Sequence, residues 1–175
     1  MIRTKRFFFR TGFSALAALL ALGLLDIAFA ASSNIDPLNK WAWGSNIGWL
    51  NLNSTNGGAT VCSDHLEGYA WAENIGWIKL GAGTGPYGNV SATNWGVNVN
   101  AAGRLFGCAW SETCGWIRFG ASYAQVAITG EPGRFSGYAW SENLGWIRFA
   151  DAGTFGLLTL VSAAPPCPGT VYRFR

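Results

Sequence analysis

Three glutamates recur at one position of a repeated pattern, and they are the first candidates for chemistry. Glu73, Glu112 and Glu142 each stand two residues after a tryptophan, in short segments rich in Ser, Asn and Gly. Two such carboxylates facing each other across a cleft could be the acid and base of a glycoside hydrolase. A catalytic pair normally occurs once in a domain, whereas these residues repeat. We therefore interpret them as turn-capping or arginine-pairing residues, and we predict no catalytic site.

Metal and cofactor chemistry are poorly supported by the remaining candidates. His65 is the only histidine, and Cys62 is the one cysteine near it. Without a C-x-x-C pair this is too few ligands for the usual zinc sets, so we predict no metal site. Gly83 to Gly88 matches G-x-G-x-x-G, but residues 89–94 lack the helical period that a dinucleotide site requires. We predict no cofactor.

The first 30 residues have the pattern of a secretory signal. A basic start precedes an apolar run over residues 12–25, and Ala28-Phe29-Ala30 supplies small residues where a signal peptidase cleaves. The run is shorter than the ~20 residues of a spanning helix. We predict cleavage after Ala30 and a bacterial protein that is secreted, periplasmic or extracellular. Its mature form, residues 31–175, would be a single domain without a transmembrane span.

The charge of that mature form argues against nucleic acid as a partner. The leader holds four of the 12 basic residues and one of the nine acidic residues, which leaves eight of each. A formally neutral chain without a Lys/Arg cluster lacks the electrostatic footprint of a nucleic-acid-binding protein.

An even number of cysteines in an exported chain favours disulfides. Cys108 and Cys114 lie in the same repeat, where other copies carry Tyr and Ile or Leu. We predict a Cys108–Cys114 bond that replaces a side-chain contact, which leaves Cys62 to pair with Cys167. The alternative is four reduced or buried thiols.

The elements that must position these residues come from one phrase that occurs four times. Each copy separates two tryptophans by five turn-forming residues, between β-prone segments, which predicts a hairpin. A third antiparallel strand is predicted before each later hairpin. An unpartnered strand near the C-terminus would serve the first hairpin and close the chain into a propeller- or prism-like ring; the alternative is an open stack. The copies span residues 41–52, 69–80, 108–119 and 138–149, the third strands residues 59–62, 97–100 and 125–128, and the C-terminal strand residues 154–160.

Two expectations concern the faces of these hairpins. A small β domain gains much from burying indoles, so we predict that most of the eight repeat tryptophans form the core. Lys79, Arg118 and Arg148 recur two residues after the second tryptophan of a copy. Alternation places them on that tryptophan's face, either as cations against an indole or as solubilising charges.

The linker over residues 81–95 is predicted to be an exposed loop.

The fourth copy, G-Y-A-W-S-E-N-L-G-W-I-R-F over Gly137 to Phe149, resembles a hairpin repeat of secreted or cell-surface bacterial proteins with no assigned activity. The resemblance implies an all-β repeat domain and supplies no catalytic residues. We expect an exported, non-catalytic protein with a structural, adhesive or surface-assembly role, whose partners are copies of itself or a cell surface. The alternative is a carbohydrate-binding, lectin-like module, and a glycoside hydrolase is the least favoured.

Overall fold

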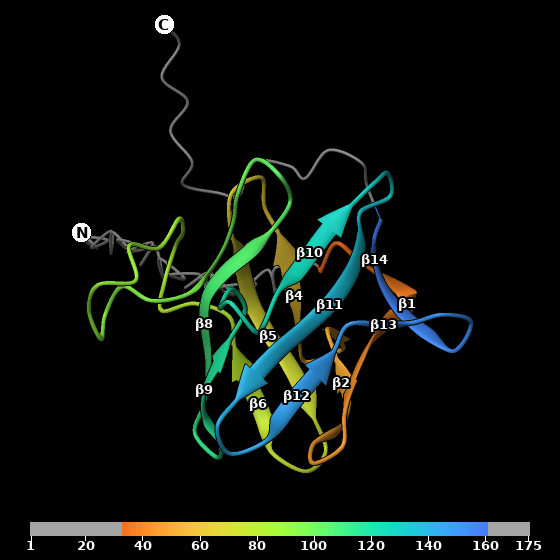
Figure 1. Ribbon diagram of the computed structural model, residues 1–175, viewed down its shortest axis with the longest axis horizontal. Helices are drawn as coiled ribbons and strands as arrows, with labels where there is room; N and C mark the ends of the chain where they lie inside the picture. The colour runs from red at the N-terminus through yellow and green to blue at the C-terminus, as the bar shows by residue number, and fades with distance from the viewer. Residues whose placement is uncertain (1–32, 161–175) are drawn as a thin grey trace, which may run out of the picture.

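The computed structural model describes residues 33–160, and every regular element in that range is a β-strand (Figure 1). The predicted leader and Cys167 lie outside the described residues. The strands are β1 (Ile35–Gly44), β2 (Gly48–Asn51), β3 (Asn53–Ser54), β4 (Gly57–Val61), β5 (Leu66–Ala72), β6 (Gly76–Lys79), β7 (Val97–Val99), β8 (Leu105–Ser111), β9 (Gly115–Arg118), β10 (Val126–Thr129), β11 (Arg134–Ser141), β12 (Gly145–Arg148), β13 (Ala150–Asp151) and β14 (Phe155–Thr159).

Each copy of the repeated phrase forms a β-hairpin, as predicted. The two tryptophans of a copy lie directly opposite each other, as Trp71 does to Trp77 and Trp140 to Trp146. The residue before the second tryptophan has positive φ, for example 78° at Gly145. Glycine adopts this conformation without the steric cost that a Cβ brings. The turn therefore favours the glycine that every copy places before its second tryptophan.

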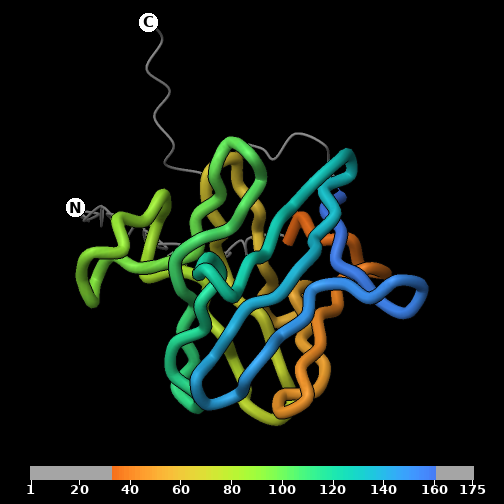
Figure 2. Tube along the Cα trace, viewed as in Figure 1, coloured from red at the N-terminus to blue at the C-terminus, as the bar shows by residue number. Residues whose placement is uncertain are grey.

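The four hairpins close into a ring of eight antiparallel strands, in the order β1-β2-β5-β6-β8-β9-β11-β12 and back to β1. Figure 2 shows the four turns gathered at one end of the molecule. The seam is a direct pairing of the first and last hairpins, with Trp43 opposite Arg148 and Gly44 opposite Ile147. The predicted closed architecture is confirmed, and the open stack is wrong.

The predicted third strands are also present. β4, β7 and β10 pair with the first strands of the later hairpins, β5, β8 and β11. β14 pairs with β1, so the C-terminal strand serves the first hairpin as expected. It also touches β11, where Arg134 lies opposite Leu158. These strands lie at the end of the molecule away from the turns (Figure 1), where Ala59, Val97 and Val126 extend the buried core.

The interior of the ring excludes the repeat tryptophans, contrary to the prediction. Ala70 and Ala139 point inward and are almost fully buried, together with Ile78 and Ile147 from the second strands. Alternation along a strand then forces the tryptophans to the outer face. Small barrels leave an interior just wide enough for such side chains to fill. Five repeat tryptophans are exposed, between 37% and 47%: Trp43, Trp49, Trp77, Trp116 and Trp146.

A cycle of hydrogen bonds joins the four turns. The Asn74 amide donates to the Ile47 carbonyl at 3.2 Å, and the Thr113 hydroxyl donates to the Ile75 carbonyl at 2.8 Å. In the other two steps Asn143 donates to Cys114 at 2.9 Å and Asn46 donates to Leu144 at 2.9 Å. Each turn thus holds the preceding one, and the last step crosses the seam.

Candidate functional site: the outer aromatic belt

In the last three hairpins the two outward tryptophans form an edge-to-face pair on the surface of the ring, whereas in the first hairpin Trp49 meets Trp41 and Phe155. Ring centroids lie 4.8 Å apart in Trp71–Trp77 and 4.7 Å apart in Trp110–Trp116. The fourth hairpin repeats this geometry at 4.8 Å. Edge-to-face contact is favourable because the positive edge of one ring meets the negative face of the other. The pairs fix the indoles as rigid plates that remain partly open to solvent.

Strand register arranges these plates into four equivalent sets, which we call junction rows. Each row crosses from one hairpin to the next and ends in the tryptophan pair of the second hairpin. Three rows carry a cation in second place and one carries Asn51. The rows are Trp41, Asn51, Trp71, Trp77; Tyr69, Lys79, Trp110, Trp116; Cys108, Arg118, Trp140, Trp146; and Tyr138, Arg148, Trp43, Trp49.

The recurrent cations therefore lie on the tryptophan face, as alternation predicted, and two of them, Lys79 and Arg148, lie between aromatic residues. Arg148 stands between Trp43 and Tyr138 in its row. Its guanidinium carbon lies 5.8 Å from the Tyr138 ring centroid, within cation–π range. Lys79 stands between Tyr69 and Trp110 in the same way.

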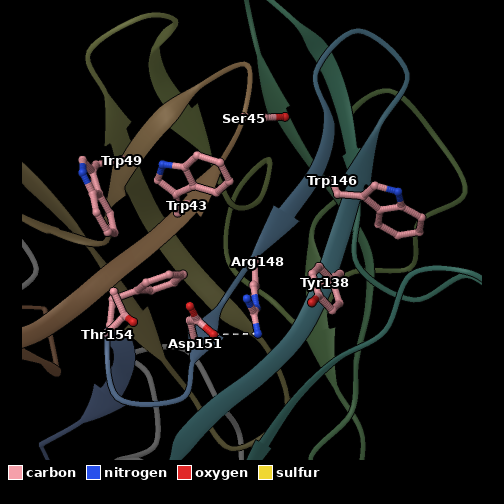
Figure 3. A pocket seen from close by; sticks show the side chains of 9 residues that line it. Trp43, Ser45, Trp49, Tyr138, Trp146, Arg148, Asp151 and Thr154 are labelled. Atoms are coloured by element: carbon pink, nitrogen blue, oxygen red, sulfur yellow. Dashed lines mark ion pairs between the residues drawn. The ribbon is translucent and has the colours of Figure 1, made fainter.

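The row at the seam lines a groove of about 460 Å³, which we call the closure groove (Figure 3). Trp43 and Trp49 stand on one side, and Trp146 and Tyr138 stand on the other. Between them Arg148 pairs with Asp151, with Nη2 and Oδ1 2.8 Å apart. The lining is Trp43, Ser45, Trp49, Tyr138, Trp146, Arg148, Asp151, Thr154 and Phe155.

A second groove, of about 440 Å³, lies over the third hairpin, and we call it the third-hairpin groove. Trp95 and Trp116 meet there at a right-angled corner, with ring centroids 5.2 Å apart and planes at 85°. Arg118 and Cys108 lie opposite each other across β8 and β9. The lining is Asn89, Val90, Ser91, Ala92, Trp95, Gly107, Cys108, Trp116 and Arg118.

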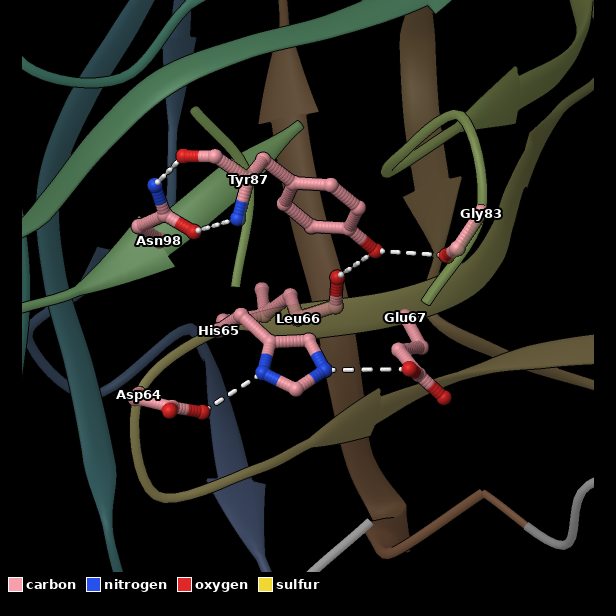
Figure 4. Close-up of polar contacts among 7 residues, drawn as sticks. All are labelled: Asp64, His65, Leu66, Glu67, Gly83, Tyr87 and Asn98. Atoms are coloured by element: carbon pink, nitrogen blue, oxygen red, sulfur yellow. Dashed lines mark hydrogen bonds and ion pairs between the residues drawn. The ribbon is translucent and has the colours of Figure 1, made fainter. Parts of the chain in front are cut away.

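The loop that walls this groove was predicted only as an exposed linker, yet part of it is firmly held. Tyr87 is buried, and its hydroxyl shares its single proton between two carbonyls, those of Leu66 at 3.0 Å and Gly83 at 3.1 Å. Burial, with the nearby Glu67 charge, raises the pKa of Tyr87 and keeps this donor protonated. Asn98 binds both the amide and the carbonyl of Tyr87 (Figure 4). The loop is thereby fixed to the ring.

His65 packs against the same loop, with its ring centroid 5.6 Å from that of Tyr87 and the two planes at 88°. It is fully buried, and its ring nitrogens lie 2.6 Å from Asp64 Oδ1 and 3.0 Å from Glu67 Oε1 (Figure 4). Ligand atoms of Cys62, His65 and Glu67 lie within 4.8 Å of one another. Cys62 is disulfide-bonded, however, and both imidazole nitrogens already have partners. We therefore interpret this cluster as a structural anchor.

The predicted disulfide within the third hairpin is wrong, because Cys108 and Cys114 are both free thiols. Cys108 shares the outer face with the tryptophans, two residues before Trp110, whereas Cys114 is buried in the turn. Their side chains thus lie on opposite sides of the hairpin. Burial raises the pKa of both thiols. The predicted partner of Cys62, Cys167, lies outside the described residues, so that pairing stays a prediction.

The recurrent glutamates stand on three different turns and are exposed. Among residues 33–160, Glu112 is the only one of the three that takes part in a side-chain hydrogen bond, which it accepts from Trp110 Nε1 at 3.3 Å. This contact agrees with a role in the turn. Ion pairing of these glutamates to an arginine is absent from residues 33–160.

Comparison of the chain with family models, with curated proteins and with solved structures finds no match. Within residues 33–160 no helix has the length and apolarity that crossing a membrane requires.

Proposed function

We propose that this chain is an exported, non-catalytic carbohydrate-binding domain whose outward tryptophans stack on sugar rings. The observation that carries the proposal is the exposure of five repeat tryptophans on one belt, each held by a neighbouring ring or strand. The apolar face of a pyranose presents C–H groups that suit the negative face of an indole. A rigid plate loses little conformational entropy when a ligand binds.

The surroundings of the plates support the same function. Sugar hydroxyls need hydrogen-bond partners beside the stacking surface, and ligand sites generally combine apolar walls with a few polar groups. The closure groove offers Ser45, Thr154 and the Arg148–Asp151 pair beside its aromatic walls. A smaller groove of about 280 Å³ between the first two hairpins offers Asn51, Glu73 and Asn74 beside three tryptophans.

A glycan array followed by calorimetry on the purified full chain tests the proposal. We expect binding of at least one oligosaccharide class and quenching or shift of tryptophan emission on binding. Trp146→Ala and Trp116→Ala should each weaken binding about fivefold or more, since stacking on an aromatic side chain is worth roughly 1–3 kcal/mol for a planar ring such as a base.

Phe106→Ala is the matched control. Phe106 is an exposed aromatic residue that lines none of the grooves described above. Its removal should leave sugar affinity unchanged within twofold. Failure of every glycan class to bind, or equal weakening by all three variants, overturns the proposal.

The belt also favours a second candidate, a structural or surface-assembly protein that packs against copies of itself. Exposed aromatic residues follow the ring through all four junction rows, and contiguous apolar surface often marks an interface. Sedimentation velocity separates the two functions. Self-assembly predicts concentration-dependent growth that Trp146→Ala reduces, whereas a sugar-binding domain sediments as one species and responds only to glycan.

A further inference from the structure

We propose that the third-hairpin groove binds a uronic acid residue of an acidic polysaccharide, with the Arg118 guanidinium on its carboxylate and the Trp116 ring on its pyranose face. This inference rests on the proposed carbohydrate-binding function and narrows it to one site and one ligand class. It comes from comparing two grooves that are built on equivalent positions of the repeat.

The two grooves share three such positions. Cys108, Trp116 and Arg118 in the third hairpin correspond to Tyr138, Trp146 and Arg148 in the fourth. Arg118 lies opposite Cys108 just as Arg148 lies opposite Tyr138. Each groove therefore presents an arginine two residues beyond an exposed tryptophan, on the same face of the strand.

The closure groove shows that this arginine position accepts a carboxylate. Asp151 follows Arg148 by three residues, and its Oδ1 lies 2.8 Å from Nη2. Arginine and carboxylate form strong, charge-assisted hydrogen bonds of this length. In the closure groove the protein itself supplies the anion.

The third hairpin lacks that internal anion. The residue three positions after Arg118 is Ala121. Among residues 33–160, no carboxylate lies within ion-pair distance of Arg118, which is exposed and lines the groove. The position that an aspartate fills in the fourth hairpin is therefore available to a ligand's carboxylate.

The rest of this groove suits a sugar better than other anions. Trp95 and Trp116 form an aromatic corner beside the arginine, and Ser91 adds a hydroxyl. The wall is fixed, because the Asn89 side chain accepts a hydrogen bond from Gly96 at 2.9 Å and lies close over Gly107. A single cation matches one carboxylate per sugar, whereas nucleic acid requires a track of cations along its phosphates.

The test measures binding of oligogalacturonate, and of the same oligosaccharide as its neutral methyl ester, to the full chain by calorimetry. We expect the acid to bind at least tenfold more tightly than the ester. Arg118→Gln should weaken binding of the acid by roughly tenfold or more, since hydrogen bonds to charged groups are the stronger kind. It should leave the ester unchanged within twofold.

Arg104→Gln is the charge-matched control, because Arg104 is exposed and lines neither groove. If Arg118→Gln and Arg104→Gln weaken the binding of oligogalacturonate equally, the attraction is one of non-specific charge and the inference is overturned. Equally tight binding of dextran sulfate by the two variants leads to the same conclusion. Binding of the ester alone also overturns it while leaving the proposed function intact. If neither sugar nor any other glycan binds, the proposed function itself fails. Circular dichroism verifies that each variant is folded.

Discussion

The closure groove and the third-hairpin groove share three equivalent lining positions, but only in the closure groove does the protein supply a carboxylate to the arginine. Both place an arginine beside an exposed tryptophan at equivalent positions of the repeat. In the fourth hairpin Asp151 neutralises Arg148, whereas the third hairpin has Ala121 at the corresponding position. The difference teaches that a repeated scaffold can vary its ligand preference through one residue just outside the repeated phrase.

Exchanging that residue between the grooves should produce the largest effect. Ala121→Asp should place a carboxylate three residues after Arg118 and weaken oligogalacturonate binding there by roughly tenfold, because the internal anion competes for the guanidinium. Asp151→Asn should leave the Arg148 charge unpaired and add a second uronate site in the closure groove. Calorimetric stoichiometry and affinity measure both effects.

The double variant Ala121→Asp/Asp151→Asn provides the control for this exchange. It should transfer uronate binding from one groove to the other without a change in net charge. Unchanged affinity and stoichiometry in both single variants would contradict the equivalence of the two grooves.

The turns beneath the grooves should, by contrast, respond alike. Asn143→Ala removes the hydrogen bond to Cys114, and Asn46→Ala removes the bond to Leu144 across the seam. Each should lower the free energy of unfolding by about 1 kcal/mol, the usual net value of one hydrogen bond. Urea denaturation measures this, with Glu142→Ala as an exposed turn control. A much larger cost for Asn46 alone would mean that the seam is a weaker junction.

The smallest predicted effect concerns the two thiols. Cys108 lines the third-hairpin groove and Cys114 is buried, so iodoacetamide should label Cys108 first in the native protein. Burial raises the pKa of both thiols, so labelling should be slow at pH 7. It should accelerate as the pH rises above the usual thiol pKa of about 8.5, because the thiolate is the nucleophile.

Oligogalacturonate that is held by the charge-assisted contact with Arg118 should lie over Cys108, which lines the same groove. We therefore expect it to slow the labelling of Cys108 about twofold to threefold. Mass spectrometry after peptide digestion distinguishes the two cysteines. Recovery of a Cys108–Cys114 disulfide would restore the pairing that was predicted from sequence.

Much of the fold could be predicted because the repeat carries its own register. Two tryptophans separated by five residues, with a glycine before the second, define each hairpin and place the rings opposite each other. The C-terminal strand, left without a partner, indicated closure, and β14 does pair with β1.

The faces of the hairpins could not be assigned in the same way, because both carry apolar residues. Alanine and isoleucine alternate with tryptophan, so hydrophobicity alone favoured burial of the larger ring. The ring radius decides the outcome, and it follows from the number of strands that close. A signal did exist for the thiols. Cys108 stands two residues before Trp110, so strand alternation places it on the tryptophan face and away from Cys114.

The grooves depend on contacts between distant parts of the chain, and for that reason sequence reasoning missed them. Trp95 reaches Trp116 only because Tyr87 and Asn98 fix the intervening loop to the ring. The Arg148–Asp151 pair spans only three residues, but its place beside Trp43 requires the seam. Spacing alone conveys neither relationship.

The seam has a consequence for how the protein reaches its native state. Trp43 meets Arg148, and Asn46 reaches Leu144, only after the fourth hairpin is available. Pairings between residues so far apart in sequence slow folding, because a long loop must close before the contact forms. We expect β1 and β12 to keep unpaired edges until that late step. A chaperone that shields these edges while the chain is incomplete would prevent strand exchange between molecules.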